Sequence, residues 1–445
     1  MRILVLDIGS SSVKASIYNA RTRRCAPTTR IPFPTTFTGP RVEIAARRLL
    51  NCVLRAGRAA LSDVRVDAVA FCTFSSGVVV TSPTGKPLTP IIVHSDRRST
   101  QIAADLVRDT GKRWWLQRTA NLPYPGGIGA STLAWLTRHE PGLFRGTYRA
   151  GQISSLVGHL LTGNWVTDPS QAVFLGLWDI RRNAWSADVC RHVGIRPDSL
   201  PHVQWADSIL GGLSPRCARA WQLTPGTPVL GGFVDTSAGI IQSPLHPGQL
   251  THNAGSTDVL AMTLDRPAPA EGILTRPVGV GRVYPPAWLA VRTIASSGSA
   301  VTWAREKLFP DLAPRAWQTM FKRALAMQDP GVTCDAAFAG QRAAIAQDAG
   351  ATFRGIRLGT TRQQMLAAIL RGLIRQSIEN YELLRQIHRP RRDVYAMGGA
   401  SALGDAMHRA WPDSHTFRAL SGDSLRGLGE LACRVLADTR HSMKT

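Results

Sequence analysis

Two aspartates in this chain each follow a short apolar run and precede small residues. Asp7 interrupts the run at residues 3–8, and Asp235 closes the run GGFVD at residues 231–235. A carboxylate at a strand end can hold a hydrated Mg²⁺ or take a proton from a substrate hydroxyl. The ordinary alternatives are a solvated Asp7 in a hairpin and an Asp235 that caps the helix beginning with Thr-Ser-Ala-Gly.

Small turns rich in glycine and hydroxyl residues recur in both halves of the chain. The first contains Gly9, Ser10, Ser11, Ser12 and Lys14. The second contains Gly255, Ser256 and Thr257, and the third contains Gly398, Gly399 and Ala400. Glycine lets a ligand approach the backbone, and N–H and hydroxyl groups donate to phosphate oxygens. Each turn taken alone is also typical of an ordinary chain reversal.

Alternating strand-like and helix-like patterns position these turns. Strands are expected at residues 3–8, 15–19, 66–74, 78–81, 91–93, 250–260 and 393–397, the sixth of these ranges including a turn. Helices are expected at 42–61, 101–109, 141–161 (in pieces), 300–309 and 363–384, and 27–40 reads as a connection. This alternation predicts an α/β protein. The Pro- and Gly-marked segment 243–248 divides it into lobes 1–243 and 249–445, of related design and facing a shared cleft.

The chain has 445 residues and a formal net charge of +23, and only six of its 53 basic residues are lysine. The arginines are scattered, without the block of like charges that marks a nucleic-acid tail. This distribution favours compositional bias and attraction of anionic ligands over a nucleic-acid surface. Seven cysteines without a CxxC pair indicate free thiols. With no signal-peptide core and no apolar run of about 18 residues, we expect a soluble cytoplasmic protein without a membrane partner.

Seven segments resemble, in order and spacing, the FGGY carbohydrate kinases. They are residues 7–14, 71–77 with 87–98 (PLTPIIVHSDRR), 161–163 with 168–179 and Trp185, 227–239 (TPVLGGFVDTSAG), 255–257, 338–342 (FAGQR) and 397–400. The resemblance implies a two-lobed actin-like ATPase (ribonuclease H-like) fold, with mixed sheets flanked by helices and ATP in the interlobe cleft.

The resemblance also implies a role for each motif. Asp235 is expected to be the general base, and Asp7 to position Mg²⁺. The three glycine turns, including Lys14, are expected to bind ATP. Ser76, His94, Asp96 and Arg98 are expected to contact a small sugar, ketose, polyol or sugar acid, and the expected assembly is a homodimer.

The chain departs from the family pattern where substrate is expected. Ser76 replaces a common histidine, His94 replaces the tryptophan of Trp-x-Asp-x-Arg, and Asp405 and Met407 replace Trp and Gln on the nucleotide side. The FCTF and PLTP segments are closer to the gluconate-phosphorylating branch than to the xylulose branch. These changes leave open a catalytically inactive ATP- or sugar-binding sensor on the same fold.

Overall fold

The computed structural model describes residues 1–340, 343–345, 350–397, 401–420 and 423–442. Its chain forms two compact units. Unit 1 contains Met1–Leu245, Asp265–Leu289 and Ser421–Thr445, and unit 2 contains His246–Leu264 and Ala290–Leu420. The chain first passes from unit 1 to unit 2 between Leu245 and His246, within the segment 243–248 that the sequence marked as a boundary. Two later segments return to unit 1, whereas the sequence-based lobes 1–243 and 249–445 placed both in the second lobe.

Unit 1 is built on a seven-stranded mixed sheet. Its order is β15 (Ile209–Gly212), β16 (Pro228–Val234), β7 (Ala68–Thr73), β1 (Arg2–Ile8), β2 (Ser12–Asn19) and β3 (Arg24–Cys25), and β4 (Thr29–Pro32) also pairs with β2. β1 and β2 form an antiparallel hairpin, while β7 runs parallel to both β1 and β16. The carboxyl ends of β1, β7 and β16 therefore meet at one edge.

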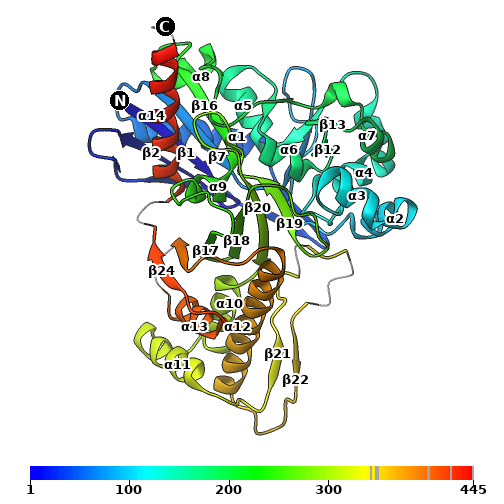
Figure 1. The fold of residues 1–445 in the computed structure, drawn as a ribbon, viewed down its shortest axis with the longest axis vertical. Helices are drawn as coiled ribbons and strands as arrows, with labels where there is room; N and C mark the ends of the chain where they lie inside the picture. The colour runs from blue at the N-terminus through cyan, green and yellow to red at the C-terminus, as the bar shows by residue number, and fades with distance from the viewer. Residues whose placement is uncertain (341–342, 346–349, 398–400, 421–422, 443–445) are drawn as a thin grey trace. The chain divides into compact units, whose positions relative to one another are not determined.

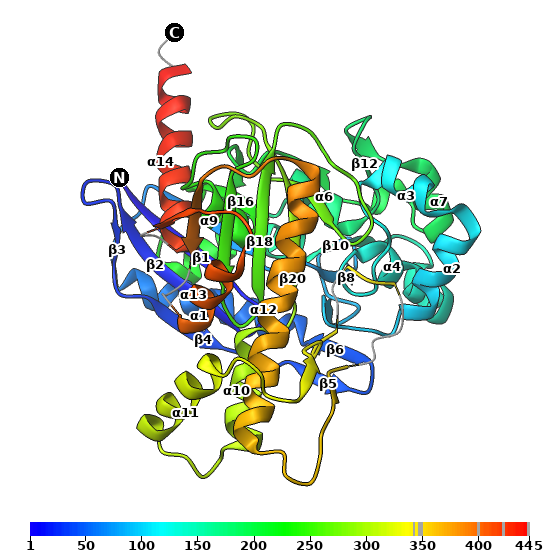
Figure 2. The same cartoon turned by 60° about the horizontal axis from the view of Figure 1, so that its bottom comes forward.

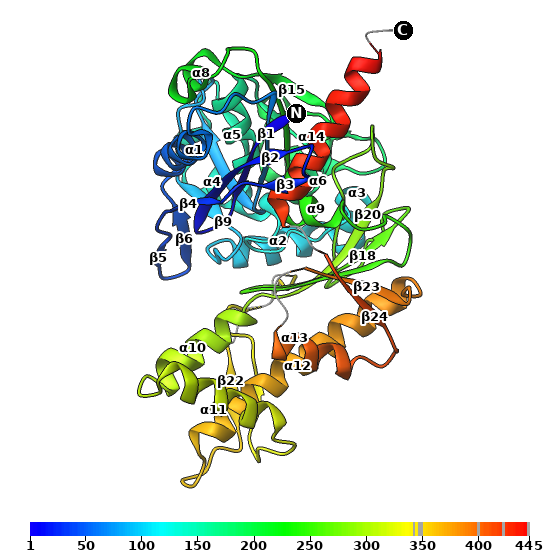
Figure 3. The same ribbon diagram turned by 90° about the vertical axis from the view of Figure 1, so that its left-hand side faces the viewer.

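Helices cover both faces of this sheet. Figure 3 shows α1 (Ala46–Leu61) on one side of β1 and β2 and α14 (Ser424–Ser442) on the other. Leu4, Leu6 and Ile8 join the core cluster that contains the buried face of α1. Because side chains alternate along a strand, Ile3, Val5 and Asp7 point to the α14 face.

Much of the rest of unit 1 lies to the right of this centre in Figure 1. A second sheet has the order β10 (Arg149–Gln152), β8 (Gly77–Thr81), β9 (Ile91–Val93), β6 (Arg41–Ile44) and β5 (Thr36–Thr38). Short pairs join β11 (Val166–Thr167) to β14 (His202–Val203) and β12 (Trp178–Asp179) to β13 (Ala184–Trp185). Further elements are α2 (Thr100–Thr110), α3 (Lys112–Thr119), α4 (Gly129–His139), α5 (Ile153–Thr162), α6 (Pro169–Leu175), α7 (Ala187–Val193), α8 (Pro215–Trp221), α9 (Asp235–Ile240) and β19 (Leu274–Pro277).

Unit 2 repeats the central motif of unit 1. Its strands follow the order β20 (Trp288–Ile294), β18 (Asp258–Leu264), β17 (Leu250–Ala254), β23 (Asp393–Met397) and β24 (Thr416–Ala419). β17 and β18 form an antiparallel hairpin, and β23 runs parallel to β17, as β7 does to β1. The first and second phosphate-turn candidates thus each join the two strands of an equivalent hairpin.

Helices pack around the long helix α12 (Arg362–Ile387) in unit 2. They are α10 (Gly298–Leu308), α11 (Pro314–Ala326) and α13 (Ala402–Ala410), and β21 (Thr333–Asp335), which pairs with β22 (Thr352–Arg354), also contacts α12. Figure 2 shows α10 beside α12. Thr361 and Gln364 form a capping box that fixes the start of α12.

Three local predictions were wrong. The expected helix at 42–61 begins only at Ala46, because residues 41–44 form β6 and pair with β9. The expected connection at 27–40 contains β4 and β5, and the helical pieces at 141–161 include β10. β4, β6 and β10 pair with strands outside their own segment, and β5 is a three-residue edge strand paired, within the described chain, only with β6, so local periodicity does not reveal them.

Candidate active site

Asp7 lies near the carboxyl end of β1, facing α14. Its side chain is 8% exposed, and its Oδ2 accepts from Ser424 Oγ at 2.7 Å and from Lys14 Nζ at 3.3 Å. Lys14 is directly opposite Asp7 in the β1–β2 register. In the described part of the chain, Oδ1 has one long contact, from Cys72 Sγ at 3.8 Å. One carboxylate oxygen is thus weakly engaged at the strand edge.

The first phosphate-turn candidate contains fewer residues than the sequence suggested, because β1 ends at Ile8 and β2 begins at Ser12. Gly9 N–H donates to Ser12 O at 3.0 Å, so Ser12 and Lys14 already belong to β2. Ser10 and Ser11 are exposed, whereas Ser12 is buried and accepts from Arg30 Nε at 3.0 Å. The exposed backbone and hydroxyl donors are therefore those of Ser10 and Ser11, with the half-exposed ammonium of Lys14 nearby.

Asp235 begins α9 directly after β16. Val234 occupies the N-cap position without a side-chain cap, and Asp235 Oδ1 accepts from Thr236 N–H at 2.6 Å. Asp235 is thus a residue of the first helical turn and not the N-cap. A β-bulge between Gly231 and Phe233 shifts the register of β16 against β7. Bulges re-aim side chains near active sites, and this one leaves Val234 beside Thr73 and Asp235 just past the sheet edge.

Cys72 lies between the two carboxylates. Burial raises the pKa of the Cys72 thiol well above its usual value, and the charges of Asp7 and Asp235 raise this pKa further. Since neighbouring strands lie about 4.8 Å apart, β1 and β16 are about 10 Å apart across β7. The structure therefore brings both predicted carboxylates to the same edge of the unit 1 sheet.

Ser76 and His94, two predicted sugar contacts, lie near this edge. Ser76 is fully buried, and its Oγ has no hydrogen-bond partner among the residues that the structure describes. The His94 ring meets Phe74 edge-on, with ring centroids 6.4 Å apart. A buried hydroxyl without a partner favours a ligand or water beside it, since leaving it unsatisfied costs about 1–3 kcal/mol.

Asp96 and Arg98 form a buried ion pair. Asp96 is fully buried, and Arg98 donates to its carboxylate from Nε at 3.0 Å and from Nη2 at 2.8 Å. Val42 N–H donates to Asp96 Oδ2 at 2.7 Å, and Glu43 also pairs with Arg98. The Arg98 guanidinium lies 5.3 Å from the centroid of the Trp135 ring. These contacts fix the loop that carries His94.

The turn Gly255, Ser256 and Thr257 of unit 2 is exposed or half-exposed and is supported by the start of α10. Ser297 N–H donates to Ser256 O at 3.0 Å, and Gly298 N–H donates to Gly255 O at 3.1 Å. A Cβ at Gly298 would lie 2.8 Å from Gly255 O. This position therefore requires glycine, and the close approach holds the turn in place.

A chain of buried polar groups braces the base of the same turn. His252 Nε2 lies 2.7 Å from Asp258 Oδ2, and His252 Nδ1 lies 2.7 Å from His408 Nε2 in α13. Neutral rings satisfy both contacts only when His408 donates to His252 and His252 donates to Asp258. These hydrogen bonds link the β17–β18 hairpin, which carries the second turn, to α13, which follows the third turn.

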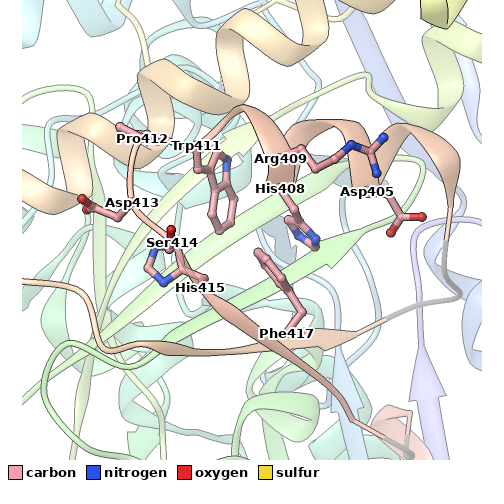
Figure 4. Close-up of a pocket in the computed structure, with 9 residues that line it drawn as sticks. All are labelled: Asp405, His408, Arg409, Trp411, Pro412, Asp413, Ser414, His415 and Phe417. Atoms are coloured by element: carbon pink, nitrogen blue, oxygen red, sulfur yellow. The ribbon is translucent and has the colours of Figure 1, made fainter.

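The third motif, Gly398, Gly399 and Ala400, lies outside the described residues, as do Gln341 and Arg342 of the FAGQR segment. A cavity of about 200 Å³ beside α13 is lined by ten residues: His252, Ala254, Ala396, Met397, Ser401, Gly404, Asp405, His408, Phe417 and Ala419. Figure 4 shows a second pocket, of about 410 Å³, in which the rings of His408, Trp411, His415 and Phe417 gather. Asp405 contributes to both, whereas Met407 is fully buried in the core.

Because His408 is buried, we expect the stability of unit 2 to fall as the pH is lowered. Burial, together with the neighbouring His252 and His415, lowers the pKa of His408 to about 3. An unfolded histidine binds a proton near pH 6.5, so stability is lost as pH falls from about 6.5 towards 3. His408→Phe should flatten the decline in thermal stability between pH 7 and 5, by at most about 1 kcal/mol per pH unit. The exposed His388→Gln is the control, and an unchanged slope in His408→Phe would contradict the prediction.

Sequence reasoning missed two hydrogen-bond partners of Asp7, Ser424 and Cys72. Ser424 is 417 residues from Asp7, and Cys72 stands in an apolar strand without a polar pattern. No local signal marks either residue. Among the described residues, no group of three or more His, Cys, Asp and Glu side chains could hold a metal.

Two family models match the chain. The N-terminal domain of the FGGY family of carbohydrate kinases matches residues 2–241, and the C-terminal domain of the same family matches residues 250–408. The chain belongs to the FGGY family of carbohydrate kinases. It is therefore a carbohydrate kinase with ATP as its phosphoryl donor, which confirms the family and enzyme class predicted from sequence.

Relatives of this FGGY kinase include several sugar kinases. It is 25% identical to an L-fuculokinase of Salmonella typhi over 90% of this chain and 84% of that protein. It is 26% identical to a xylulose kinase of Streptomyces rubiginosus over 61% of this chain, but the match spans only 56% of that relative's length.

Solved structures confirm the actin-like two-domain fold of this FGGY kinase. A xylulose kinase from Rhodospirillum rubrum has a TM-score of 0.83 at 22% identity, covering 97% of this chain and 89% of that one. A gluconate kinase from Lactobacillus acidophilus has a TM-score of 0.86 at 16% identity, covering 98% and 89%. No helix in the described part of this chain is long and apolar enough to cross a membrane.

Proposed function

We propose that this kinase transfers the γ-phosphoryl group of ATP to a hydroxyl of a sugar, ketose, polyol or sugar acid, with Asp235 as general base. The observation that carries the proposal is the gathering of Asp7 and Asp235 on either side of Cys72. Phosphoryl transfer needs mainly positioning and charge stabilisation, which two carboxylates at one sheet edge can supply. Asp235 would take the hydroxyl proton as the oxygen attacks phosphorus, and ADP would leave.

Asp7 is the proposed Mg²⁺ residue. Mg²⁺ commonly binds one or two carboxylates and completes its shell with water and substrate phosphates, and the weakly engaged Oδ1 of Asp7 fits that use. The ion would neutralise phosphate charge when bound. Ser424 and Lys14 hold the other oxygen, Oδ2, and so orient the carboxylate.

The nucleotide is proposed to bind the glycine turns of both units. In unit 1, Gly9, Ser10, Ser11, Ser12 and Lys14 contribute, with Ser10 and Ser11 as the exposed donors. In unit 2, Gly255, Ser256 and Thr257 would hold phosphate oxygens. Gly398, Gly399 and Ala400 are proposed on the adenosine side from their sequence alone.

The sugar is proposed to bind near Ser76, His94, Asp96 and Arg98. The Ser76 hydroxyl suits a substrate hydroxyl because it is buried and lacks a partner in the described chain. Asp96 is already bonded to Arg98 and to Val42 N–H. We therefore propose that the Asp96–Arg98 pair chiefly orients the loop that presents His94. The homodimer stays a prediction.

A substrate panel tests the proposal. ADP release would be measured with ATP and Mg²⁺ against L-fuculose, D-xylulose, D-gluconate and glycerol, with a no-sugar control. We expect turnover with at least one member, because relatives include an L-fuculokinase, xylulose kinases and a gluconate kinase. Thermal stabilisation by ATP without turnover on a wider panel of ketoses, polyols and sugar acids would instead indicate the sensor, which the altered Ser76 and His94 positions favour and the retained Asp235 opposes.

A further inference from the structure

Arg276 is a buried arginine that touches the helix start carrying Asp235. It lies in β19 and is 1% exposed. Its Nη1 donates to Ser237 Oγ at 2.6 Å and to Pro277 O at 3.0 Å, and its Nη2 donates to Thr236 Oγ1 at 2.8 Å. Burying a guanidinium is costly unless it is bonded on several sides. The position therefore calls for a reason beyond packing.

The strand that carries Arg276 is held from its other side. Asn121 Oδ1 accepts from Thr275 N–H at 2.8 Å, and Asn121 Nδ2 donates to Thr275 O at 2.7 Å. Successive side chains of a strand point in opposite directions. Anchoring Thr275 through its backbone thus directs Arg276 towards α9, where its planar fork reaches two adjacent hydroxyls.

The residue before Asp235 is fixed as well. Val234 N–H donates to Ser170 Oγ at 3.2 Å, and Ser170 N–H donates to Asp168 Oδ2 at 2.8 Å. Burial raises the pKa of Asp168 to about 7, while hydrogen bonds from Ser170 and Gln171 and the charge of Arg276 lower it. Arg276 is thus within electrostatic reach of the carboxylate that caps α6. The residue before Asp235 is therefore held by α6, and the two residues after it are held by Arg276.

We propose that Arg276 is a positioning residue for phosphoryl transfer, which locks the first turn of α9 so that Asp235 meets the substrate hydroxyl. This inference rests on the proposed role of Asp235 as general base. Helix α9 has six residues and no side-chain N-cap, so its start depends on contacts from outside. A guanidinium that binds two neighbouring hydroxyls fixes both the position and the rotation of that turn.

The test compares Arg276→Met and Arg276→Lys with the parent on the best substrate of the panel. A displacement of about 1 Å at a reacting group can cost about 10²-fold. We expect Arg276→Met to lower kcat by about 10²-fold with both KM values within about threefold. Lysine keeps the charge without the fork, so Arg276→Lys should recover part of kcat. The Arg276 guanidinium lies 5.6 Å from the centroid of the Phe174 ring, and the Arg118 guanidinium lies 4.5 Å from that of Trp114. Arg118→Met is therefore the control and should retain full activity.

Opposite outcomes would overturn the inference. A folded Arg276→Met enzyme with kcat within threefold of the parent, or with intact kcat and a raised sugar KM, excludes a positioning role. If Arg276→Met does not fold, Ser237→Ala decides, because it removes one acceptor and keeps the arginine. We then expect about a tenfold loss in kcat with unchanged KM, and an unchanged kcat overturns the proposal. Loss of activity in Asp235→Asn alongside a normal Arg276→Met would reject this inference and leave the general base in place.

Discussion

Asp235→Asn is expected to lower kcat for sugar phosphorylation by about 10²–10⁴-fold, the usual cost of losing a general base. Asparagine has nearly the same shape, and its amide oxygen can still accept from Thr236 N–H as the Asp235 carboxylate does. The fold and the KM values should therefore change little. The measurement is ADP release at saturating sugar and ATP, with a thermal melt to confirm folding.

Asp198→Asn is the matched control for this variant. Asp198 is another unit 1 aspartate, but its side chain is 78% exposed. Its replacement should leave turnover within about twofold, since surface changes are usually nearly neutral. Undiminished turnover in Asp235→Asn would refute the assignment of Asp235 as base, even if the enzyme phosphorylates a sugar.

A large loss of stability is expected at Gly231, in the bulge that sets the register of β16. Gly231 has φ +103°, and a Cβ there would lie 2.1 Å from the backbone oxygen of Phe71 in β7. Backbone atoms of a central strand cannot move aside cheaply. Gly231→Ala should lower the free energy of unfolding by more than about 3 kcal/mol and also reduce kcat, because Asp235 closely follows the bulge.

Gly226→Ala is the control that distinguishes the steric clash expected at Gly231 from the cost of a positive φ alone. Gly226 also has a positive φ, +83°, but a Cβ added there would have no atom within 4 Å. Its replacement should cost only about 1–2 kcal/mol, the conformational penalty of a left-handed residue. Urea unfolding followed by tryptophan fluorescence measures both variants. Equal losses would show that the bulge is not under the steric constraint described.

Sequence patterns located the two carboxylates because each follows a continuous apolar run. The buried strands β1, β7 and β16 have such runs, and parallel pairing then brings their carboxyl ends together. The long helix α12 was equally visible from its period. Local sequence patterns therefore predict the elements that are long, apolar or strongly periodic.

The remaining features depend on contacts between distant residues. Strand β6 pairs Glu43 with Ile92, and nothing in the residues around Glu43 distinguishes that strand from the start of α1. Arg276 is one of many arginines in a strongly basic chain, and only its burial against Thr236 and Ser237 sets it apart. Such partners are chosen by tertiary packing, which a single sequence does not display.

The return of α14 to unit 1 has a consequence for biosynthesis. Strand β1 leaves the ribosome long before the helix that covers its Ile3 and Val5 face and supplies Ser424 to Asp7. During elongation this apolar face stays uncovered until a segment more than 400 residues away has been synthesised. The site around Asp7 is thus completed only when α14 has been synthesised. Until then the nascent chain exposes an aggregation-prone central strand, which molecular chaperones would be suited to shield.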